Sequence, residues 1–265
     1  MTVVDRLARE APAGITFRQE ADGDLAFVEA LFASTRADEM ARVPWPPEAV
    51  AAFLQSQCAL QRAHYRQHYG DGLFLIVEQD HRPVGRLYLH ESASELRIMD
   101  IALLPDARGR GVGTTLVRSV IGHAREATLR VTLHVEPDNP AQRLYARQGF
   151  RLVEHRGVYD FLEWRPSRPL ESLTAGEFEA VDRDTFTLRQ DSGETIALVL
   201  DGVTRRPAAG ANAREGFSLV FESASGTVLP QRIYRLEQDR LGPLDVFLVP
   251  IGRGPDGIRY EAVFG

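Results

Sequence analysis

The 265-residue sequence predicts an α+β or α/β domain, built on a mixed and mostly antiparallel sheet flanked by helices, followed by a small all-β domain. Three observations support this prediction. The first part of the chain alternates strand-like runs with helical apolar stripes. A glycine-rich loop joins a strand to a helix near the middle of that part. After residue 169, short strand-like runs separated by turn residues replace the helical pattern, which is typical of a small sandwich or barrel.

The first part contains two predicted helices before its main run of strands. A short strand at residues 15–18 precedes a helix with apolar residues at helical spacing, and a second helix is expected over residues 48–69. Polar turns separate three further runs, which predicts an antiparallel meander over residues 73–78, 83–90 and 96–104. The remaining elements are expected in the order helix, strand, helix, strand, strand, at residues 111–126, 129–135, 139–148, 151–154 and 158–164.

The proline-bearing polar stretch Arg165–Pro169 marks the predicted domain boundary. We therefore expect one domain over residues 1–165, a linker over 166–169 and a β-rich domain over 170–265. No helix is predicted in the second domain. Its expected strands are separated by turn clusters such as Asp191–Gly193, and they lie at residues 185–189, 195–200, 217–222, 232–236, 246–251 and 259–264.

Composition and charge exclude several classes of protein. The hydrophobic fraction of 44% and the charged fraction of 26% are ordinary for a globular protein. A net charge of −6 provides no overall basic field for nucleic acid or for an anionic membrane surface. The single cysteine, Cys58, can form neither an internal disulfide nor a zinc site. Since no signal peptide or membrane-spanning run is present, we expect a cytoplasmic protein without nucleic-acid or membrane partners.

The segment Ile101–Leu116 reads as a strand, a glycine-rich loop with two arginines, and a helix. Such a loop can present backbone amides to an anion, and the following helix adds its unpaired N–H groups. A P-loop is excluded because Thr114 follows Gly113 where Gly-Lys-Ser/Thr is required. A Rossmann loop is excluded because Thr114 or Leu116 falls at the third glycine position.

Two motifs in order resemble the signatures of the GNAT acetyltransferases. Arg108-x-x-Gly111-x-Gly113 resembles their coenzyme A pyrophosphate loop. One strand further on, Asn139–Phe150 reads NPAQRLYARQGF and is similar to their second signature, Asn-x-x-Ala-x-x-Leu-Tyr-x-x-x-Gly-Phe, with one residue fewer between the asparagine and the alanine. The resemblance covers residues 15–164, and it implies the GNAT acyl-CoA N-acyltransferase fold. Taken alone, the loop could instead be a tight strand-to-helix turn, with glycines that allow its geometry and arginines that favour solubility.

The resemblance implies acetyl-CoA as co-substrate and no metal. In this family the pantetheine arm lies between two separating strands, with one strand amide polarising the thioester carbonyl. By this likeness the coenzyme site comprises one strand end, the loop, the helix start and one asparagine: Ile101, Ala102, Leu103, Arg108, Arg110, Gly111, Val112, Gly113, Thr114 and Asn139.

Two residues are the candidate catalytic groups. By the family likeness Tyr145 would protonate the departing thiolate, although a helical tyrosine beside Leu144 could instead only pack. Asp100 is the first candidate for the base that leaves the attacking amine neutral. If the preceding turn is centred on Ala93, Arg86 lies opposite Asp100, and a cross-strand ion pair worth about 0.2–1 kcal/mol is the alternative role of that carboxylate. The implied mechanism is direct transfer in a ternary complex.

Three further residues are candidates for the acceptor site. Arg86 and Tyr88 alternate on one strand face together with His90, which is consistent with a pocket lining or with a solvated face. His134 interrupts an apolar strand and is either a proton shuttle or a core histidine. The acceptor itself is expected to be a small-molecule or protein amine.

Five runs of the second domain together resemble an uncharacterised bacterial β-domain family: Phe217–Phe221, Gln231–Tyr234, Leu241–Leu244, Phe247–Pro250 and Tyr260–Phe264. It lacks histidine and cysteine, and we see no acid pair, triad or metal-ligand cluster in its sequence. We therefore expect a binding or assembly module with a protein partner rather than a second enzyme. The alternative to acetyl transfer is a catalytically silent acyl-CoA-binding sensor or scaffold whose β-domain binds that partner.

Overall fold

A computed structural model describes residues 1–190, 194–206 and 215–265, so the predicted turn at 191–193 lies outside the described residues. The chain divides into two compact units, Met1–Trp164 and Arg165–Gly265. Each unit has its own cluster of buried apolar residues. The two units are therefore described separately.

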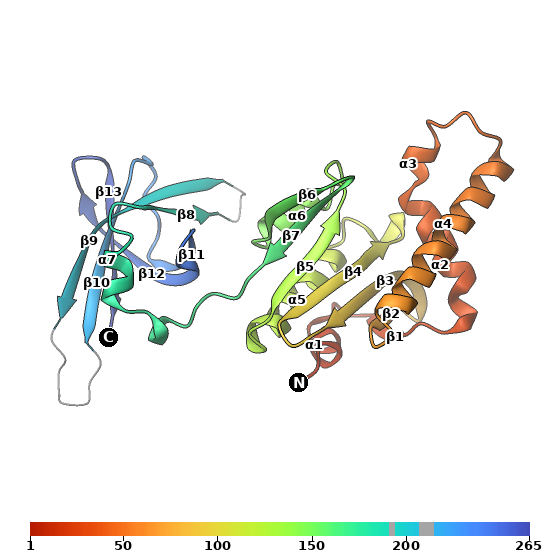
Figure 1. Ribbon diagram of the computed structural model, residues 1–265, viewed down its shortest axis with the longest axis horizontal. Helices are drawn as coiled ribbons and strands as arrows, with labels where there is room; N and C mark the ends of the chain where they lie inside the picture. Colours follow the sequence, from red (N-terminus) through yellow and green to blue (C-terminus); the bar gives the residue numbers. More distant parts are fainter. Residues whose placement is uncertain (191–193, 207–214) are drawn as a thin grey trace. The chain divides into compact units, whose positions relative to one another are not determined.

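The first unit is built on a seven-stranded sheet in the order β1-β2-β3-β4-β5-β7-β6 (Figure 1). Only β4 and β5 are parallel, and the other neighbours are antiparallel. The predicted mixed and mostly antiparallel sheet is thus confirmed. The strands are β1 (Ile15–Gln19), β2 (Leu73–Gln79), β3 (Arg82–Glu91), β4 (Glu95–Leu103), β5 (Arg130–Val135), β6 (Arg151–Arg156) and β7 (Tyr159–Trp164).

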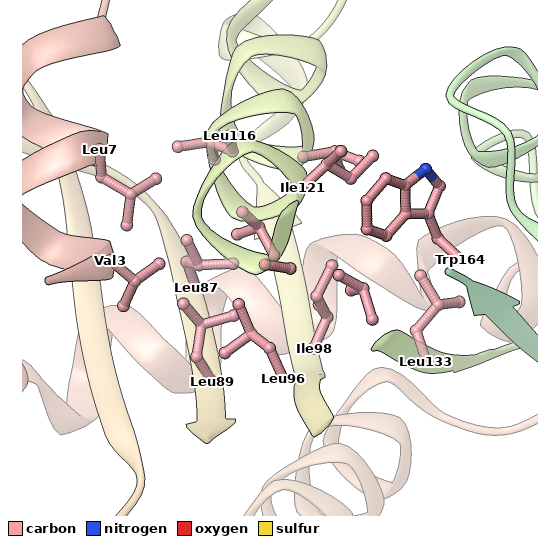
Figure 2. Packing of buried hydrophobic residues seen from close by; sticks show 14 of the residues in the cluster. Val3, Leu7, Leu87, Leu89, Leu96, Ile98, Leu116, Ile121, Leu133 and Trp164 are labelled. Atoms are coloured by element: carbon pink, nitrogen blue, oxygen red, sulfur yellow. The ribbon is translucent and has the colours of Figure 1, made fainter. Parts of the chain in front are cut away.

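Helices cover both faces of the sheet. On one face, apolar side chains of α1 (Val3–Glu10) and α5 (Val112–Glu126) pack on β3, β4 and β5, and Figure 2 shows them gathered over the strand residues. On the other face, α2 (Leu25–Thr35) and α4 (Pro47–His68) pack against β2 through a smaller cluster that includes Cys58. The short helices α3 (Ala37–Met40) and α6 (Gln142–Arg147) and the 3₁₀ turns η1 (Asp22–Asp24) and η2 (Pro105–Ala107) complete the unit.

The sequence analysis missed the N-terminal helix α1. Its amphipathic pattern is interrupted by Arg6, which is nevertheless buried. Arg6 forms ion pairs with Glu10 of the same helix and with Glu126 of α5. A capping box at Thr2 and Asp5 closes the helix start. The arginine therefore belongs to the packed face because its charge is paired there.

The second unit is a closed six-stranded antiparallel barrel in the order β10-β13-β12-β11-β8-β9. The prediction of an all-β domain is confirmed, but the expectation of no helix is wrong. The helix α7 (Ala175–Glu179) begins at a capping box formed by Thr174 and Glu177, and its Phe178 lies in the apolar core. The strands are β8 (Thr185–Arg189), β9 (Thr195–Arg206), β10 (Gly216–Ser223), β11 (Arg232–Gln238), β12 (Gly242–Arg253) and β13 (Ile258–Phe264), and the 3₁₀ turn η3 is Leu170–Ser172.

We predict that fragments 1–164 and 165–265 each fold alone. The two apolar cores share no residue, so neither fragment loses part of its core when the chain is divided. The second fragment must begin at Arg165, because Arg235 of β11 donates hydrogen bonds to the Arg165 carbonyl and to Ser167. Cooperative thermal unfolding of each purified fragment, followed by circular dichroism, checks this. Aggregation or non-cooperative melting of either fragment would contradict it.

We also predict that Gly85→Ala weakens the sheet at the end of β4. A methyl group at this position would lie 2.5 Å from the backbone oxygen of Ala102, on the neighbouring strand. The strands must separate to accommodate it, so we expect the free energy of unfolding to fall by about 1–3 kcal/mol. Urea denaturation of the full chain measures this, with Gly23→Ala as the control because a methyl group there meets no atom within 4 Å. Equal stability of the two variants would contradict the prediction.

Candidate active site

The central strands β4 and β5 are paired over only part of their length. Their parallel register runs from Glu95 opposite Arg130 to Ile98 opposite Leu133, and stops there. Beyond that point β4 remains paired with β3 as far as Leu103, while β5 stays paired with β7. The two central strands therefore separate, and a gap opens between their carboxyl ends.

The backbone of β4 presents alternate groups to this gap. The Leu104 N–H donates to the Val84 carbonyl at 2.8 Å, so by the antiparallel alternation the N–H and C=O of Ala102 are directed to β3. Those of Ile101 and Leu103 point the other way, toward β5. The Leu103 carbonyl accepts a hydrogen bond from Arg108 Nε at 2.8 Å. Of the three residues predicted to bind pantetheine through their backbone, Ile101 and Leu103 are thus directed to the gap and Ala102 is not.

A β-bulge at Met99 sets which side chains face the site. Leu89 pairs with Ile98 but Tyr88 pairs with Asp100, so Met99 is the extra residue of β4. Its carbonyl accepts a hydrogen bond from the Tyr65 hydroxyl of α4 at 2.9 Å. The predicted register, with Arg86 opposite Asp100, is wrong because it assumed an unbroken ladder and a turn centred on Ala93.

The gap continues into a cavity of 410 Å³. It is lined by residues of α2, α4, β3, β4, β5, β7 and the segment around α6, and both candidate catalytic residues are among them. The lining residues are Phe32, Thr35, Arg36, Gln61, His64, Tyr65, Tyr69, Arg86, Arg97, Ile98, Met99, Asp100, Ile101, Ala102, Leu133, His134, Val135, Glu136, Asn139, Ala141, Tyr145 and Tyr159.

Tyr145 of α6 contributes a hydroxyl to the cavity wall. The ring is buried and packs edge-to-face on Phe150 at 5.5 Å. No described residue forms a hydrogen bond with its hydroxyl. Burial, and next the negative charge of Asp100, raise the pKa of Tyr145 above its usual value. The hydroxyl therefore keeps its proton at neutral pH and can donate it to a group in the cavity.

Asp100 is held by a buried guanidinium. Arg86 Nη2 donates to Asp100 Oδ2 at 2.6 Å and to Gln61 Oε1 at 2.9 Å. Arg86 is 2% exposed, so the pair is the ion pair that the sequence analysis considered, formed despite the shifted register. Among the described residues Asp100 Oδ1 has no hydrogen-bond partner, which leaves one oxygen of this carboxylate available.

The glycine-rich loop follows the end of β4. The first backbone bond of α5 runs from Thr115 N–H to the Gly111 carbonyl, so the amides of Val112, Gly113 and Thr114 have no partner within the helix. Gly111 has a left-handed φ of 83°. Arg108 and Arg110 are exposed. The arrangement fits the pyrophosphate of a coenzyme, because three free amides and the positive end of the helix dipole converge there.

The remaining predicted residues have clear structural partners. Asn139 Oδ1 accepts from the Ala141 N–H at 2.9 Å and starts the turn before α6, although the residue also lines the cavity. His134 lines the cavity and accepts a hydrogen bond at Nδ1 from Arg97 at 2.7 Å. Tyr88 is buried, bonded through its hydroxyl to Glu20, and does not line the cavity.

Sequence reasoning missed several polar and charged residues of the cavity lining. Arg36 pairs with Glu136 at 2.8 Å, and Glu136 directly follows β5. Glu136 could have been found from the sequence, because it is a carboxylate at the end of a predicted strand and lies three residues before Asn139. Arg36 and Tyr159 carry no such signal, because they come from distant elements that only the fold brings together.

Strands that separate beside a helix start, with a cavity in the gap, define an acyl-CoA N-acyltransferase fold. Residues 29–150 match the model of the family described as the acetyltransferase (GNAT) family. Residues 173–264 match a domain of unknown function (DUF6916). Both resemblances noted in the sequence are thereby confirmed.

A Bacillus subtilis (strain 168) protein, named as a "putative" ribosomal protein bS18-alanine N-acetyltransferase, is 32% identical over 80 residues. The match covers 29% of this chain and 53% of that protein, so the chain spans about half the length of this relative.

Two solved structures are similar to part of the chain at low identity. The PaiA N-acetyltransferase of Thermoplasma acidophilum, in complex with coenzyme A, is 20% identical with a TM-score of 0.45, and the match covers 57% of this chain and 98% of that chain. YncA of Salmonella typhimurium, with acetyl-CoA, is 17% identical with a TM-score of 0.38, covering 59% and 96%. The assignment therefore rests on the family match and the strand order.

None of the described helices combines the length and the apolar composition needed to cross a membrane. In the described ranges, no three histidine, cysteine, aspartate or glutamate side chains gather as metal ligands would. The cytoplasmic location and the protein partner of the second unit stay predictions.

Proposed function

We propose that the first unit transfers the acetyl group of acetyl-CoA directly to an amine acceptor in a ternary complex. The observation that carries the proposal is the cavity beside the separated β4 and β5, whose lining includes both Tyr145 and Asp100. The free amides at the start of α5 support binding of the coenzyme pyrophosphate.

In the proposed reaction the amine nitrogen attacks the thioester carbonyl carbon, and the carbon–sulfur bond breaks. The backbone N–H of Ile101, which is directed into the gap, is suited to stabilise the developing oxyanion. Tyr145 donates its proton to the departing thiolate. Asp100 accepts the proton that the amine loses, through its free Oδ1 or a bridging water. The thiol of coenzyme A and the N-acetylated acceptor are the products, and no acyl-enzyme forms.

Isothermal calorimetry and an assay of coenzyme A release test this function. We expect acetyl-CoA to bind the full chain, and thiol release to depend on added amine, with small amines and N-terminal peptides as the two arms of the panel. Binding without release for every amine would favour a silent acyl-CoA sensor. Absence of binding would remove both functions. The free Tyr145 hydroxyl favours the enzyme, because a sensor has no thiolate to protonate.

A further inference from the structure

The cavity carries an excess of positive charge. Its described lining contains three arginines and two carboxylates, so its net charge is +1 when the histidines are neutral. Two of the arginines are paired with the two carboxylates, Arg36 with Glu136 at 2.8 Å and Arg86 with Asp100 at 2.6 Å. Arg97 of β4 is therefore the source of the excess charge.

The contacts of Arg97 leave it only weakly neutralised. Its Nη1 lies 3.8 Å from Glu95 Oε1, beyond hydrogen-bond distance. That carboxylate already accepts from Arg130 at 2.8 Å and from Thr132 at 2.6 Å. The Arg97 side chain is 24% exposed, so a ligand in the cavity can reach it.

His134 does not provide a counter-charge, and it fixes the guanidinium. Its Nδ1 accepts from Arg97 Nη2 at 2.7 Å, which places the proton of the neutral ring on Nε2. Burial, and next the neighbouring Arg97, lower the pKa of His134 below its usual value. The imidazole is therefore neutral at neutral pH, and it orients Arg97 without reducing its charge.

The bulge at Met99 brings Arg97 and Asp100 to the same face. In an unbroken strand, residues three apart point to opposite faces. Because Arg97 pairs with His90 and Asp100 pairs with Tyr88, the extra residue restores a common face. Their Cα atoms are separated by at most about 10 Å along the strand. One small molecule can therefore reach both side chains.

The excess charge is not positioned for the phosphates of the coenzyme. Those are expected at the amides of Val112 to Thr114, beyond the carboxyl end of β4. From Arg97 to Leu104 the extended strand spans about 23 Å, which a side chain cannot bridge. Arg97 thus faces the acceptor part of the cavity.

We propose that the acceptor is a small amine that also carries a carboxylate, and that Arg97 binds this carboxylate while the amine lies near Asp100. A guanidinium matches a carboxylate in shape and charge. That of Arg97 donates to His134 through Nη2 and keeps further N–H groups that can donate to a ligand. The inference rests on the proposed function, because it assigns this cavity to the acceptor. Arg97 is a specificity residue in this assignment and has no role in the chemical step.

Calorimetry on the full chain saturated with coenzyme A tests the proposal. The probes are glycine, β-alanine, γ-aminobutyrate and ε-aminocaproate, each compared with the alkylamine of the same chain length. We expect at least one carboxylated amine to bind about 10- to 100-fold more tightly than its matched alkylamine, as a charge-assisted contact provides. This preference should be lost in Arg97→Gln and largely kept in Arg97→Lys.

Arg130→Gln is the matched control. This substitution also removes one positive charge, from an arginine that contacts the same carboxylate, Glu95. Unlike Arg97, however, Arg130 does not line the cavity. The proposal is overturned if the wild type binds no carboxylated amine more tightly than its matched alkylamine. It is also overturned if Arg97→Gln and Arg130→Gln lose this preference equally. Failure of the proposed function is seen separately, as absence of amine-dependent thiol release in a chain that retains the binding preference.

Discussion

Tyr145→Phe is expected to lower the rate of acetyl transfer about 100-fold or more, because the variant lacks the proton donor for the thiolate. The ring of Tyr145 is buried against Phe150, and phenylalanine preserves that packing. Since no described residue is bonded to the hydroxyl, its removal leaves no partner unsatisfied. We therefore expect the affinity for acetyl-CoA and the thermal stability to change little.

Single-turnover kinetics with saturating acetyl-CoA measure this effect, since slow product release would otherwise hide a damaged chemical step. Calorimetry of acetyl-CoA on the same variant is the control. A wild-type chemical rate in Tyr145→Phe would contradict the assignment, and the thiolate would then take its proton from water or depart unassisted.

Gly111→Val is expected to abolish measurable acetyl-CoA binding. Gly111 has a φ of 83°, which a β-branched residue adopts only with strain. Relieving that strain turns the amides of Val112 and Gly113 away from the anion that they are expected to face. The added side chain itself meets no protein atom within 4 Å at its Cβ, so the unit should remain folded.

Gly111→Asn separates backbone conformation from side-chain bulk, because asparagine tolerates the left-handed region. We expect this variant to retain most of the acetyl-CoA affinity that Gly111→Val loses, as measured by calorimetry with circular dichroism as the folding control. Equal affinity in the wild type and the valine variant would show that the loop does not bind the coenzyme.

Local patterns were sufficient for much of the fold. The strand, loop and helix over residues 96–126 were predicted to within two residues, because hydrophobic period and glycine placement act over a few neighbours. Helix α7 was missed although its capping box at Thr174 and Glu177 is visible in the sequence. Helix α1 was missed because a buried arginine reads as polar until its partner Glu126, more than a hundred residues away, is known.

The sequence by itself was sufficient for the family resemblance of the first unit, the amides proposed for a pyrophosphate and the candidate role of Tyr145, since these depend on residues close together in the chain. The tertiary structure decided which side chains share the cavity. The bulge at Met99 rotates Asp100 onto the face of Arg97, and it depends on the pairing with β3 and on the bond from Tyr65. A register shift of one residue moves the following side chains of a strand to the opposite face of the sheet. No local sequence pattern specifies this shift, because a β3–β4 ladder with the bulge and one without it are consistent with the same alternation of polar and apolar residues.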